Sequence, residues 1–375
     1  MGKLKIAIIG CGSIANTKHM QNLSKFADRA EMVAFCDIDR AKAEKACKEF
    51  GVPGSKVYED YHELLKLDLD AVHVCTPNRS HAEITVAALE AGKNVMCEKP
   101  MAINTTDAKK MLDTQQKTGK LLTVGYQNRF RLDTMTLKKM AEEDQLGEIY
   151  VAKAHALRRR GIPNWGVFTN KFEQGGGPII DIATHSLDMT LWIMDNYKPV
   201  SVMGATFDKL GTTLRGEEQG TDEHWDPDAY EVEDAGYGFV KFENGALVFI
   251  ETSWALNTTD QKQAMSTVYG TKAGVEMKFN QSDLSVVTTD RVLEVNQTTA
   301  GRLSIERIPV EDPNDANTND LIFTYPGATA ECKAWLDALE GKAELVVKPE
   351  QAYVVTQILD AVYESAKTGK LVELK

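Results

Sequence analysis

Short β-branched runs alternate with amphipathic helical segments over the first 125 residues, and this alternation constrains the fold more than any other feature of the chain. Parallel strands need crossover connections that helices usually supply, so the pattern predicts a doubly wound α/β domain over residues 1–125. Helical segments such as Ala41–Phe50 and Ala82–Ala91 lie between the strands, and Gly92 follows the second as a helix C-cap does. The expected strands are Leu4–Ile9, Met32–Cys36, Ala71–Cys75, Asn94–Cys97 and Leu121–Val124.

A glycine-rich turn, Gly10–Ala15, follows the first of these strands and opens a helix. It has the G-x-G-x-x-A form of a dinucleotide-binding turn, in which the first glycine makes the tight turn and the second lets the backbone approach a pyrophosphate. The amides at the helix N-terminus then attract the phosphate charge. Because a strand precedes the motif and a helix follows it, we expect Gly10, Gly12, Ser13 and Ile14 to bind a dinucleotide.

Asp37 closes the second expected strand, where a carboxylate accepts hydrogen bonds from the hydroxyls of the adenosine ribose. A 2′-phosphate at that position would meet a like charge, so Asp37 favours NAD as the cofactor. Two alternatives stay open. Asp37 can be a turn residue alone, and Arg40 nearby leaves NADP possible.

Thr76, Pro77 and Asn78 end the next long strand, at the carboxyl edge where open α/β sheets bind ligands. We expect them to contact the cofactor, and His81 can reach it from three residues further on. A plain strand-ending turn explains the tripeptide almost as well, and a histidine at a helix N-terminus more often has only a structural role.

Lys99 follows the strand Asn94–Cys97 and precedes Pro100, which stiffens the turn. Oxidation of a secondary alcohol requires a base within hydrogen-bond reach of the hydroxyl. An oxidised nicotinamide ring and partial desolvation would both disfavour the ammonium form of a nearby lysine, so Lys99 is a candidate proton carrier. The alternative is an ordinary exposed lysine.

Asp181 and His185 lie four residues apart on an apolar helix that follows Gly175–Gly177. On a regular helix they project from the same face, so the carboxylate can fix the tautomer of an imidazole that accepts the substrate proton. We expect the three glycines to let a bulky substrate approach the backbone. In the alternative interpretation, Asp181 serves the helix dipole and His185 only pairs with it.

The remainder of the chain, residues 126–375, predicts an α+β domain with a large, open, mostly antiparallel sheet. Asn244 and Gly245 indicate a tight hairpin. Helices can cover only one face of so large a sheet, so we expect a homodimer or homotetramer to bury the other face. The expected strands are Ile149–Leu157, Val200–Phe207, Ala235–Phe242 and Ala246–Trp254, and the expected helices are Ala328–Leu339 and Pro349–Lys367.

Three adjacent arginines, Arg158–Arg160, precede Trp165 in an otherwise acidic chain. They can form a solvated rim, or they can hold an acidic sugar, a phosphate or a partner subunit. We name Arg160 as a candidate substrate ligand and Trp165 as a platform for a pyranose face. Residues 208–234 carry ten acidic and two basic groups, and we expect them to form a mobile insertion.

Composition excludes several classes of protein. A net charge of −12 argues against nucleic acid and anionic membranes as partners. No apolar run reaches membrane-spanning length, and the sequence runs into its first strand without a signal-like leader. The six cysteines show no C-x-x-C spacing, which favours reduced core thiols and a cytoplasmic location. No spacing indicates a metal site.

Taken together, the turn Gly10–Ala15, the segments Cys75–Asn78 and Ala91–Pro100, and the stretch Gly175–His185 resemble the Gfo/Idh/MocA family of glucose-fructose oxidoreductase and inositol dehydrogenase. The resemblance spans nearly the whole chain. It implies a Rossmann domain, an α+β domain, NAD or NADP as cofactor, and sugars or cyclitols as substrates. By motif position it implies that Lys99, Asp181 and His185 are catalytic, that Glu98 lies beside the nicotinamide, and that Gln127 and Arg129 face cofactor or substrate.

We therefore expect an NAD-dependent oxidoreductase that moves a hydride between nicotinamide and a hydroxyl or carbonyl of a sugar, sugar derivative or cyclitol. One alternative is redox-neutral cleavage of a glycoside through a transient 3-keto intermediate. A less favoured one is a sensor that binds a dinucleotide without turnover.

Overall fold

The computed structural model describes residues 2–220, 224–279, 291–310 and 327–374. The chain divides into two compact units. The first unit contains residues 1–127 and 327–356, and the second contains 128–326 and 357–375. The helix α10 (Pro349–Thr368) contributes residues to both units. A domain boundary at residue 125 stays a prediction.

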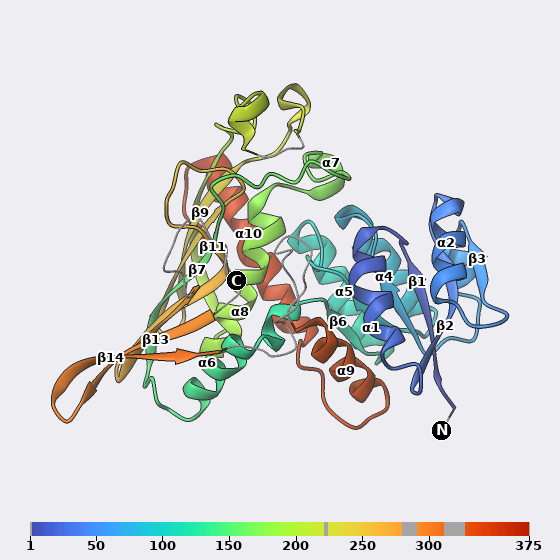
Figure 1. The fold of residues 1–375 in the computed structure, drawn as a ribbon, viewed down its shortest axis with the longest axis horizontal. Coiled ribbons are helices and arrows are strands. Elements are labelled where there is room, and N and C mark those ends of the chain that lie inside the picture. Colours follow the sequence, from blue (N-terminus) through green and yellow to red (C-terminus); the bar gives the residue numbers. More distant parts are fainter. Residues whose placement is uncertain (1, 221–223, 280–290, 311–326, 375) are drawn as a thin grey trace. The chain divides into compact units, whose positions relative to one another are not determined.

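The first unit is built on a six-stranded sheet in which every pairing is parallel, with the strand order β3-β2-β1-β4-β5-β6 (Figure 1). This confirms the predicted doubly wound domain. The strands are β1 Leu4–Ile9, β2 Ala30–Cys36, β3 Lys56–Tyr58, β4 Ala71–Val74, β5 Asn94–Cys97 and β6 Leu122–Val124. The helical segments are η1 Ala15–His19, α1 Met20–Ser24, α2 Arg40–Phe50, α3 Tyr61–Leu64, η2 Asn78–Ser80, α4 His81–Glu90, α5 Thr105–Thr118 and α9 Ala328–Leu339. The short helix η3 Gln127–Phe130 begins at the last residue of the unit's first segment and continues into the second unit.

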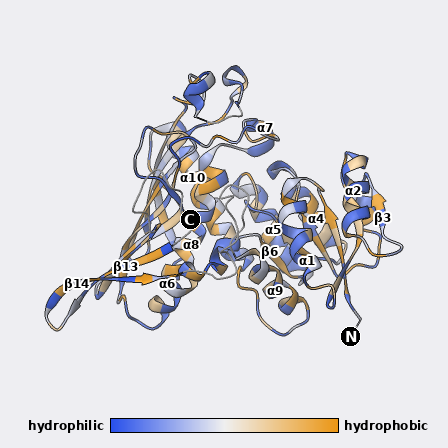
Figure 2. Ribbon diagram, in the orientation of Figure 1, coloured by the Kyte–Doolittle hydropathy of each residue, from blue (hydrophilic) through white to orange (hydrophobic). Residues whose placement is uncertain are grey.

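Buried apolar side chains on the strands explain why this sheet forms. Ile6 and Ile8 of β1 and Phe35 of β2 are fully buried, and hydrophobic residues follow the strands in Figure 2. Trp335 and Leu336 of α9 belong to the same apolar cluster although they come more than 300 residues later in the chain. The late helix α9 therefore completes the core of the dinucleotide-type domain.

The second unit carries a nine-stranded sheet with the order β14-β13-β12-β11-β7-β10-β9-β8-β15. All its pairings are antiparallel except that between β7 and β10. The strands are β7 Ile149–Leu157, β8 Pro199–Phe207, β9 Ala235–Phe242, β10 Leu247–Ser253, β11 Lys262–Gly270, β12 Ala273–Phe279, β13 Arg291–Thr299, β14 Arg302–Pro309 and β15 Val372–Glu373. The helical segments are α6 Leu132–Glu142, α7 Lys171–Gln174, η4 Ile179–Ala183, α8 Thr184–Met194, η5 Gly216–Gln219 and η6 Pro227–Ala229.

One face of this sheet packs against helices. Ala152, Ala154 and Ala156 of β7 alternate on the buried face, and α8 contacts β7 and β11. Gly204 of β8 leaves room for α10, because a Cβ there would lie 2.7 Å from a methyl carbon of Val362. The predicted hairpin between β9 and β10 is confirmed: Gly245 has a φ of +87°, and the amide of Phe242 donates to the carbonyl of Ala246.

The acidic segment 208–234 is folded against the second unit where the structure describes it, so the expected mobile insertion is wrong for residues 208–220 and 224–234. Trp225, Tyr230 and Val232 are buried in an apolar cluster with Trp254. The indole of Trp225 donates a hydrogen bond to the carbonyl of Gly211 at 2.8 Å. Net charge and low apolar content misled the prediction, because the few apolar side chains of the segment are buried and polar contacts such as that of Trp225 support them.

All six cysteines are unpaired, and five of them are buried. Burial raises the pKa of the Cys11, Cys36, Cys97 and Cys332 thiols to about 12, so these thiols are protonated at neutral pH. Within the described ranges, no helix combines the length and apolar character needed to cross a membrane.

Candidate active site

The turn after β1 is closed by a carboxylate from the end of β2. Gly10 has a φ of +87°, and a Cβ on it would lie 2.7 Å from the carbonyl carbon of Cys75. Asp37 accepts hydrogen bonds from the backbone amides of Cys11 and Asp39, at 2.8 and 2.9 Å. Glycine is therefore required at position 10 by both backbone conformation and packing, and Asp37 fixes the turn whether or not it also binds a ribose.

Three features of this edge of the sheet fit a dinucleotide. A Cβ on Gly12 would meet no atom within 4 Å, so space is open above the turn. Ser13 is exposed and Ile14 half-buried at the start of the helix that η1 continues. The hydroxyl of Thr76 is buried and makes no hydrogen bond within the part of the chain that the structure describes. A cofactor hydroxyl or phosphate oxygen could satisfy it.

His81 ties together the two loops that flank this edge. Its ring nitrogens lie 2.8 Å from the carbonyl of Pro100 and 2.9 Å from that of Thr76. The side chain is 1 % exposed, and burial lowers the pKa of its imidazole, although the two carbonyls oppose that change. The contacts favour the structural role considered from the sequence, and contact of His81 with the cofactor stays a prediction.

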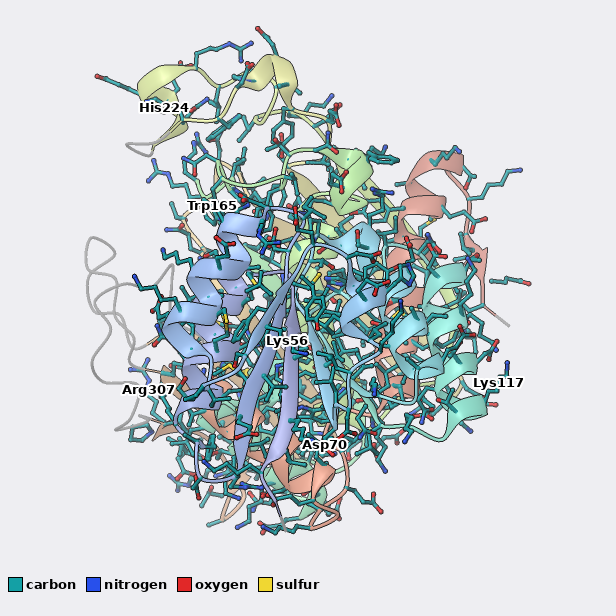
Figure 3. All side chains as sticks on the ribbon, turned by 90° about the vertical axis from the view of Figure 1, so that its right-hand side faces the viewer. Lys56, Asp70, Lys117, Trp165, His224 and Arg307 are labelled. Carbon is teal, nitrogen blue, oxygen red and sulfur yellow. The ribbon has the colours of Figure 1, made fainter. Side chains whose placement is uncertain are left out.

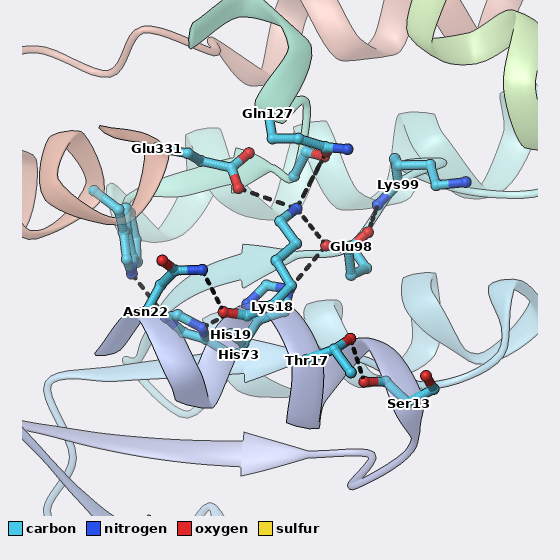
Figure 4. A network of polar contacts seen from close by, with 12 residues as sticks. Ser13, Thr17, Lys18, His19, Asn22, His73, Glu98, Lys99, Gln127 and Glu331 are labelled. Carbon is cyan, nitrogen blue, oxygen red and sulfur yellow. Dashed lines mark hydrogen bonds and ion pairs between the residues drawn. The ribbon is translucent and has the colours of Figure 1, made fainter. Parts of the chain in front are cut away.

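Glu98 lies at the centre of a buried polar cluster (Figure 4). One carboxylate oxygen accepts from Lys18 Nζ at 2.7 Å and from His19 Nε2 at 2.8 Å. The other accepts from the backbone amide of Lys99 at 3.1 Å. Burial alone would raise the pKa of the Glu98 carboxyl, but Lys18 and His19 hold it well below its usual value. The sequence placed Glu98 beside the nicotinamide, whereas the structure shows both its oxygens engaged by the protein itself.

Lys18 brings a second carboxylate into the same cluster. Its ammonium lies 3.0 Å from Glu331 and 3.3 Å from the side-chain oxygen of Gln127. Burial opposes the charge, but Glu331 and Glu98 outweigh it and raise the pKa of Lys18. Gln127 is buried and contributes to the cluster through this contact. We call Lys18, His19, His73, Glu98, Glu331 and Trp335 the Glu98 cluster.

The side chain of Lys99 points away from this cluster, although its backbone amide contacts Glu98. The Lys99–Pro100 peptide is cis, and the half-buried side chain of Lys99 extends away from Glu98 (Figure 4). Glu98 thus holds the backbone of Lys99 and leaves its amine outside the buried ion pairs of the cluster. The proton-carrying role of Lys99 stays a prediction.

In the second unit, Asp181 lies in the π-helical turn η4, and α8 begins at Thr184, just before His185. The predicted regular helix through Asp181 is therefore wrong in detail, and π-helical turns are frequent at functional sites. Asp181 is 8 % exposed and accepts a hydrogen bond from the indole of Trp254 at 3.0 Å. His185 is half-buried. Orientation of His185 by Asp181 stays a prediction.

At Gly176 and Gly177, before η4, the space that a Cβ would need is filled by the protein itself, which corrects the expectation that these two glycines admit substrate. A Cβ on Gly176 would lie 2.0 Å from the hydroxyl of Tyr363, and one on Gly177 would lie 2.1 Å from the carbonyl of Glu233. Glu233 also accepts from the amides of Gly177 and Ile179, at 2.9 and 3.2 Å, and from the hydroxyl of Tyr363 at 2.7 Å. These contacts fix the entrance to the turn that bears Asp181.

An aromatic row lies near Asp181. Trp165 is 43 % exposed (labelled in Figure 3), and its ring lies 5.8 Å from that of Phe168, which in turn lies 6.4 Å from that of Trp254. Trp165 has the exposure that a sugar platform needs, and this role stays a prediction.

The arginine tract divides between two roles. Burial lowers the pKa of the Arg158 guanidinium, and attraction to Asp181 opposes the change, so Arg158 lies within the electrostatic reach of Asp181. Arg160, the candidate substrate ligand, donates to the carbonyl of Glu218 at 3.2 Å and to the side chain of Asn257 at 2.9 Å. Its contacts hold the acidic segment, and substrate binding by Arg160 stays a prediction.

Arg129, expected at the substrate, is fully buried in the second unit. Its guanidinium forms a two-point ion pair with Asp188 of α8, at 2.6 and 2.9 Å, and lies over the ring of Trp192. The structure thus gives Arg129 a structural role that holds η3 to α8. Gln127 and Arg129, which are separated by one residue in the motif, are therefore both buried in the protein.

Sequence reasoning missed Trp254, Glu233 and most of the Glu98 cluster. For Trp254 the sequence indicated only the end of an expected strand, and its contact with Asp181 is known from the structure alone. No signal existed for Glu331, which precedes the apolar residues of α9 like any surface glutamate. Within the described residues, no group of three His, Cys, Asp or Glu side chains could hold a metal ion.

Comparison with known proteins places this geometry in a family. Residues 4–126 match the model "Oxidoreductase family, NAD-binding Rossmann fold", and residues 138–374 match "Oxidoreductase family, C-terminal alpha/beta domain". The chain is 37% identical over 372 residues to D-glucoside 3-dehydrogenase of Escherichia coli K12, covering 99% of this chain and 97% of the relative. It is 30% identical over 289 residues to myo-inositol 2-dehydrogenase of Thermotoga maritima, covering 76% and 78%.

Solved structures share the fold. A levoglucosan dehydrogenase in complex with NADH and L-sorbose aligns over all of both chains, with a TM-score of 0.80 and 21% identity. Together with the match of both halves of the chain and the long alignment to the relative from Escherichia coli, this establishes that the protein belongs to the Gfo/Idh/MocA oxidoreductase family and carries that family's NAD-binding Rossmann domain.

Proposed function

We propose that this protein is an NAD-dependent dehydrogenase that oxidises a secondary hydroxyl of a sugar ring, with C3 of a glucoside as the first candidate position. The observation that carries the proposal is the 37% identity to D-glucoside 3-dehydrogenase across 99% of this chain and 97% of that one. The similarity to a myo-inositol 2-dehydrogenase supports a ring hydroxyl as the common element of the substrate class.

The cofactor would be held at the carboxyl edge of the six-stranded sheet. Gly10, Gly12, Ser13 and Ile14 would meet its phosphates, Asp37 its ribose, and Thr76, Pro77 and Asn78 the half nearer the nicotinamide. When bound, NAD supplies the acceptor for the hydride. The carboxylate of Asp37 already accepts two backbone amides, and a 2′-phosphate beside it would be repelled, so NAD is preferred over NADP.

We assign proton transfer to Lys99 and His185, and orientation of His185 to Asp181. As the hydride leaves carbon, the hydroxyl proton passes to one of these bases, and the products are a ketone, NADH and the protonated base. The indole N–H of Trp254 donates a hydrogen bond to one oxygen of Asp181 at 3.0 Å, which supports a fixed orientation of that carboxylate.

The experiment offers NAD and NADP to the purified protein with glucosides, free sugars and inositols, and follows NADH formation together with the position of the new carbonyl by NMR. We expect reduction of NAD with a glucoside and a carbonyl at C3. Binding of NAD without reduction by any hydroxyl compound would instead indicate the dinucleotide sensor.

Redox-neutral glycoside cleavage begins with the same oxidation at C3. The relative from Escherichia coli is named for oxidation at that position, which supports cleavage as a second candidate function. A C3 ketone acidifies the hydrogen at C2, so the aglycone can leave from C1, and addition of water and return of the hydride complete the cycle. NADH accumulation equal to glucoside consumed supports the dehydrogenase, whereas release of aglycone with no net NADH supports cleavage.

We also propose that the protein is a homodimer or homotetramer that pairs through the face of the nine-stranded sheet opposite α8. Met203, Phe207 and Tyr269 are about two-fifths exposed, and the rings of Phe239 and Phe249 pack on each other beside them. Large exposed apolar side chains of this kind mark association surfaces. A monomeric mass by light scattering at micromolar concentration would exclude the oligomer.

Six unpaired thiols support a reducing, cytoplasmic location for the protein.

A further inference from the structure

The Glu98 cluster contains a chain of hydrogen bonds whose direction is fixed by chemistry. It begins at Trp335 of α9, whose indole N–H lies 3.0 Å from Nε2 of His73. An indole nitrogen can only donate, so Nε2 of His73 must be the acceptor and carries no proton. His73 is therefore a neutral imidazole with its proton on Nδ1.

The same reasoning fixes the next residue. Nδ1 of His73 lies 2.9 Å from Nδ1 of His19. Because His73 donates from this atom, His19 accepts, and its own proton must lie on Nε2. Nε2 of His19 then donates to Glu98 at 2.8 Å. Burial independently lowers the pKa of both imidazoles, most strongly that of His73, which agrees with two neutral rings.

The chain ends at the backbone of Lys99. His19 and Lys18 both occupy one oxygen of Glu98, which leaves the other oxygen to accept the amide of Lys99 at 3.1 Å (Figure 4). The contributing residues come from η1, β4, the end of β5 and α9, so four separate elements must be in place. A carboxylate held from these directions cannot shift without breaking several bonds at once.

We infer that the chain from Trp335 through His73 and His19 to Glu98 is a positioning device for Lys99, and that Trp335 sets its direction. The inference rests on the proposed function for the role of Lys99. None of these four residues is assigned to the chemistry itself. A buried ion pair such as Lys18 and Glu98 is weak evidence for stability, because desolvation offsets the attraction. Stability therefore does not explain the cluster, whereas the fixed placement of Lys99 does.

The first test needs no activity. Long-range nitrogen–proton correlation by NMR reports the tautomer of each imidazole, and loss of a signal in His73→Gln or His19→Gln assigns it. In the wild-type protein at neutral pH we expect a proton on Nδ1 of His73 and on Nε2 of His19. A proton on Nε2 of His73, or a doubly protonated ring at either position, overturns the inference.

The second test compares Trp335→Phe with Arg29→Met. Both loosen α9, because Arg29 pairs at 2.7 Å with Asp337 of that helix and with its C-cap residue Glu340. Only the first substitution removes the donor to His73. We expect Trp335→Phe to lower kcat by about tenfold, with NAD affinity within about twofold of wild type, because slight misplacement of a catalytic group is costly. Arg29→Met should lower Tm and keep kcat.

The outcomes separate the two proposals. An inactive wild-type protein with the expected tautomers contradicts the proposed function and leaves the hydrogen-bond chain intact. An active wild-type protein in which both variants retain kcat, or lose it equally, contradicts the positioning role of Trp335.

Discussion

Glu98 in the first unit and Glu233 in the second are both buried carboxylates that hold the backbone of a segment bearing a candidate catalytic residue, but their surroundings differ. Glu98 accepts from a charged lysine and a histidine besides the amide of Lys99. Within the described residues, the hydrogen-bond donors to the Glu233 carboxylate are all neutral: the amides of Gly177 and Ile179 and the hydroxyl of Tyr363. Burial raises the pKa of Glu233, whereas Lys18 and His19 overcome burial and lower that of Glu98.

The difference shows that one structural task can be performed with or without a compensating charge. Ionised Glu98 is stabilised by Lys18, so removal of the Glu98 carboxylate leaves the buried ammonium of Lys18 with fewer partners. Ionised Glu233 is costly to bury, and its neutral donors return only part of that cost. In this interpretation both glutamates act as scaffolding, and the chemistry is the role that we propose for Lys99 and His185.

The largest expected effect tests that division. His185→Ala should lower kcat by roughly 10²- to 10⁴-fold, the usual contribution of a general base, with little change in NAD affinity. Steady-state kinetics and NAD titration measure the two quantities. His224→Ala is the matched control, because His224 is an exposed histidine of the same unit. Equal loss of turnover and NAD affinity in His185→Ala would mean that the residue is structural.

The next effect compares the two glutamates directly. Glu98→Ala should lower the free energy of unfolding by about 3 kcal/mol or more, because it removes an acceptor of a buried ammonium. Glu233→Ala should cost less, about 2 kcal/mol, because the donors left behind are neutral. Denaturant unfolding at neutral pH measures both, and a larger loss for Glu233→Ala would reverse the comparison.

Local pattern predicted much of this architecture. The bounds of β1, β5, β7 and α9 are those expected. Runs of β-branched residues identify strands, and the spacing of apolar residues identifies a helix with one buried face. Local pattern did not predict the strands β11 to β14. Local pattern also indicated the turn Gly10–Ala15, because strand, glycines and helix are neighbours in sequence.

Contacts between distant residues were not predictable in the same way. Lys18 meets Glu98 and Glu331 across 80 and more than 300 residues, and no pattern around position 18 indicates a buried lysine. Gly176 and Gly177 were misread for a related reason. A glycine shows that a side chain is absent, and only the structure shows that Tyr363 and Glu233 fill the space.

Substitutions at two glycines, one in each unit, extend the comparison of the two units. Gly177→Ala should cost about 1–3 kcal/mol of stability, because its Cβ would lie 2.1 Å from the Glu233 carbonyl. Gly12→Ala should leave stability within about 0.5 kcal/mol and weaken NAD binding instead, because its Cβ meets only open space. Unfolding and NAD titration of both variants check this. Unchanged NAD affinity in Gly12→Ala would argue against a dinucleotide above the turn.

The smallest expected effect is the pH dependence of the two carboxyls, which should have opposite signs. The folded pKa of Glu98 is depressed, so its stabilisation is present above the unfolded value of about 4.3 and is lost as pH falls toward the folded pKa. The folded pKa of Glu233 is raised, so its contribution is present below the unfolded value and is lost as pH rises through the folded pKa.

On acidification from neutral pH, the stability difference between wild type and Glu98→Gln should therefore shrink, whereas wild type should gain stability relative to Glu233→Gln. Denaturant unfolding of the three proteins between about pH 7 and pH 4 measures both trends, since each variant removes one titrating carboxyl and shares all others with wild type. Trends of the same sign would show that Lys18 does not govern the ionisation of Glu98, and the two glutamates would then be equivalent.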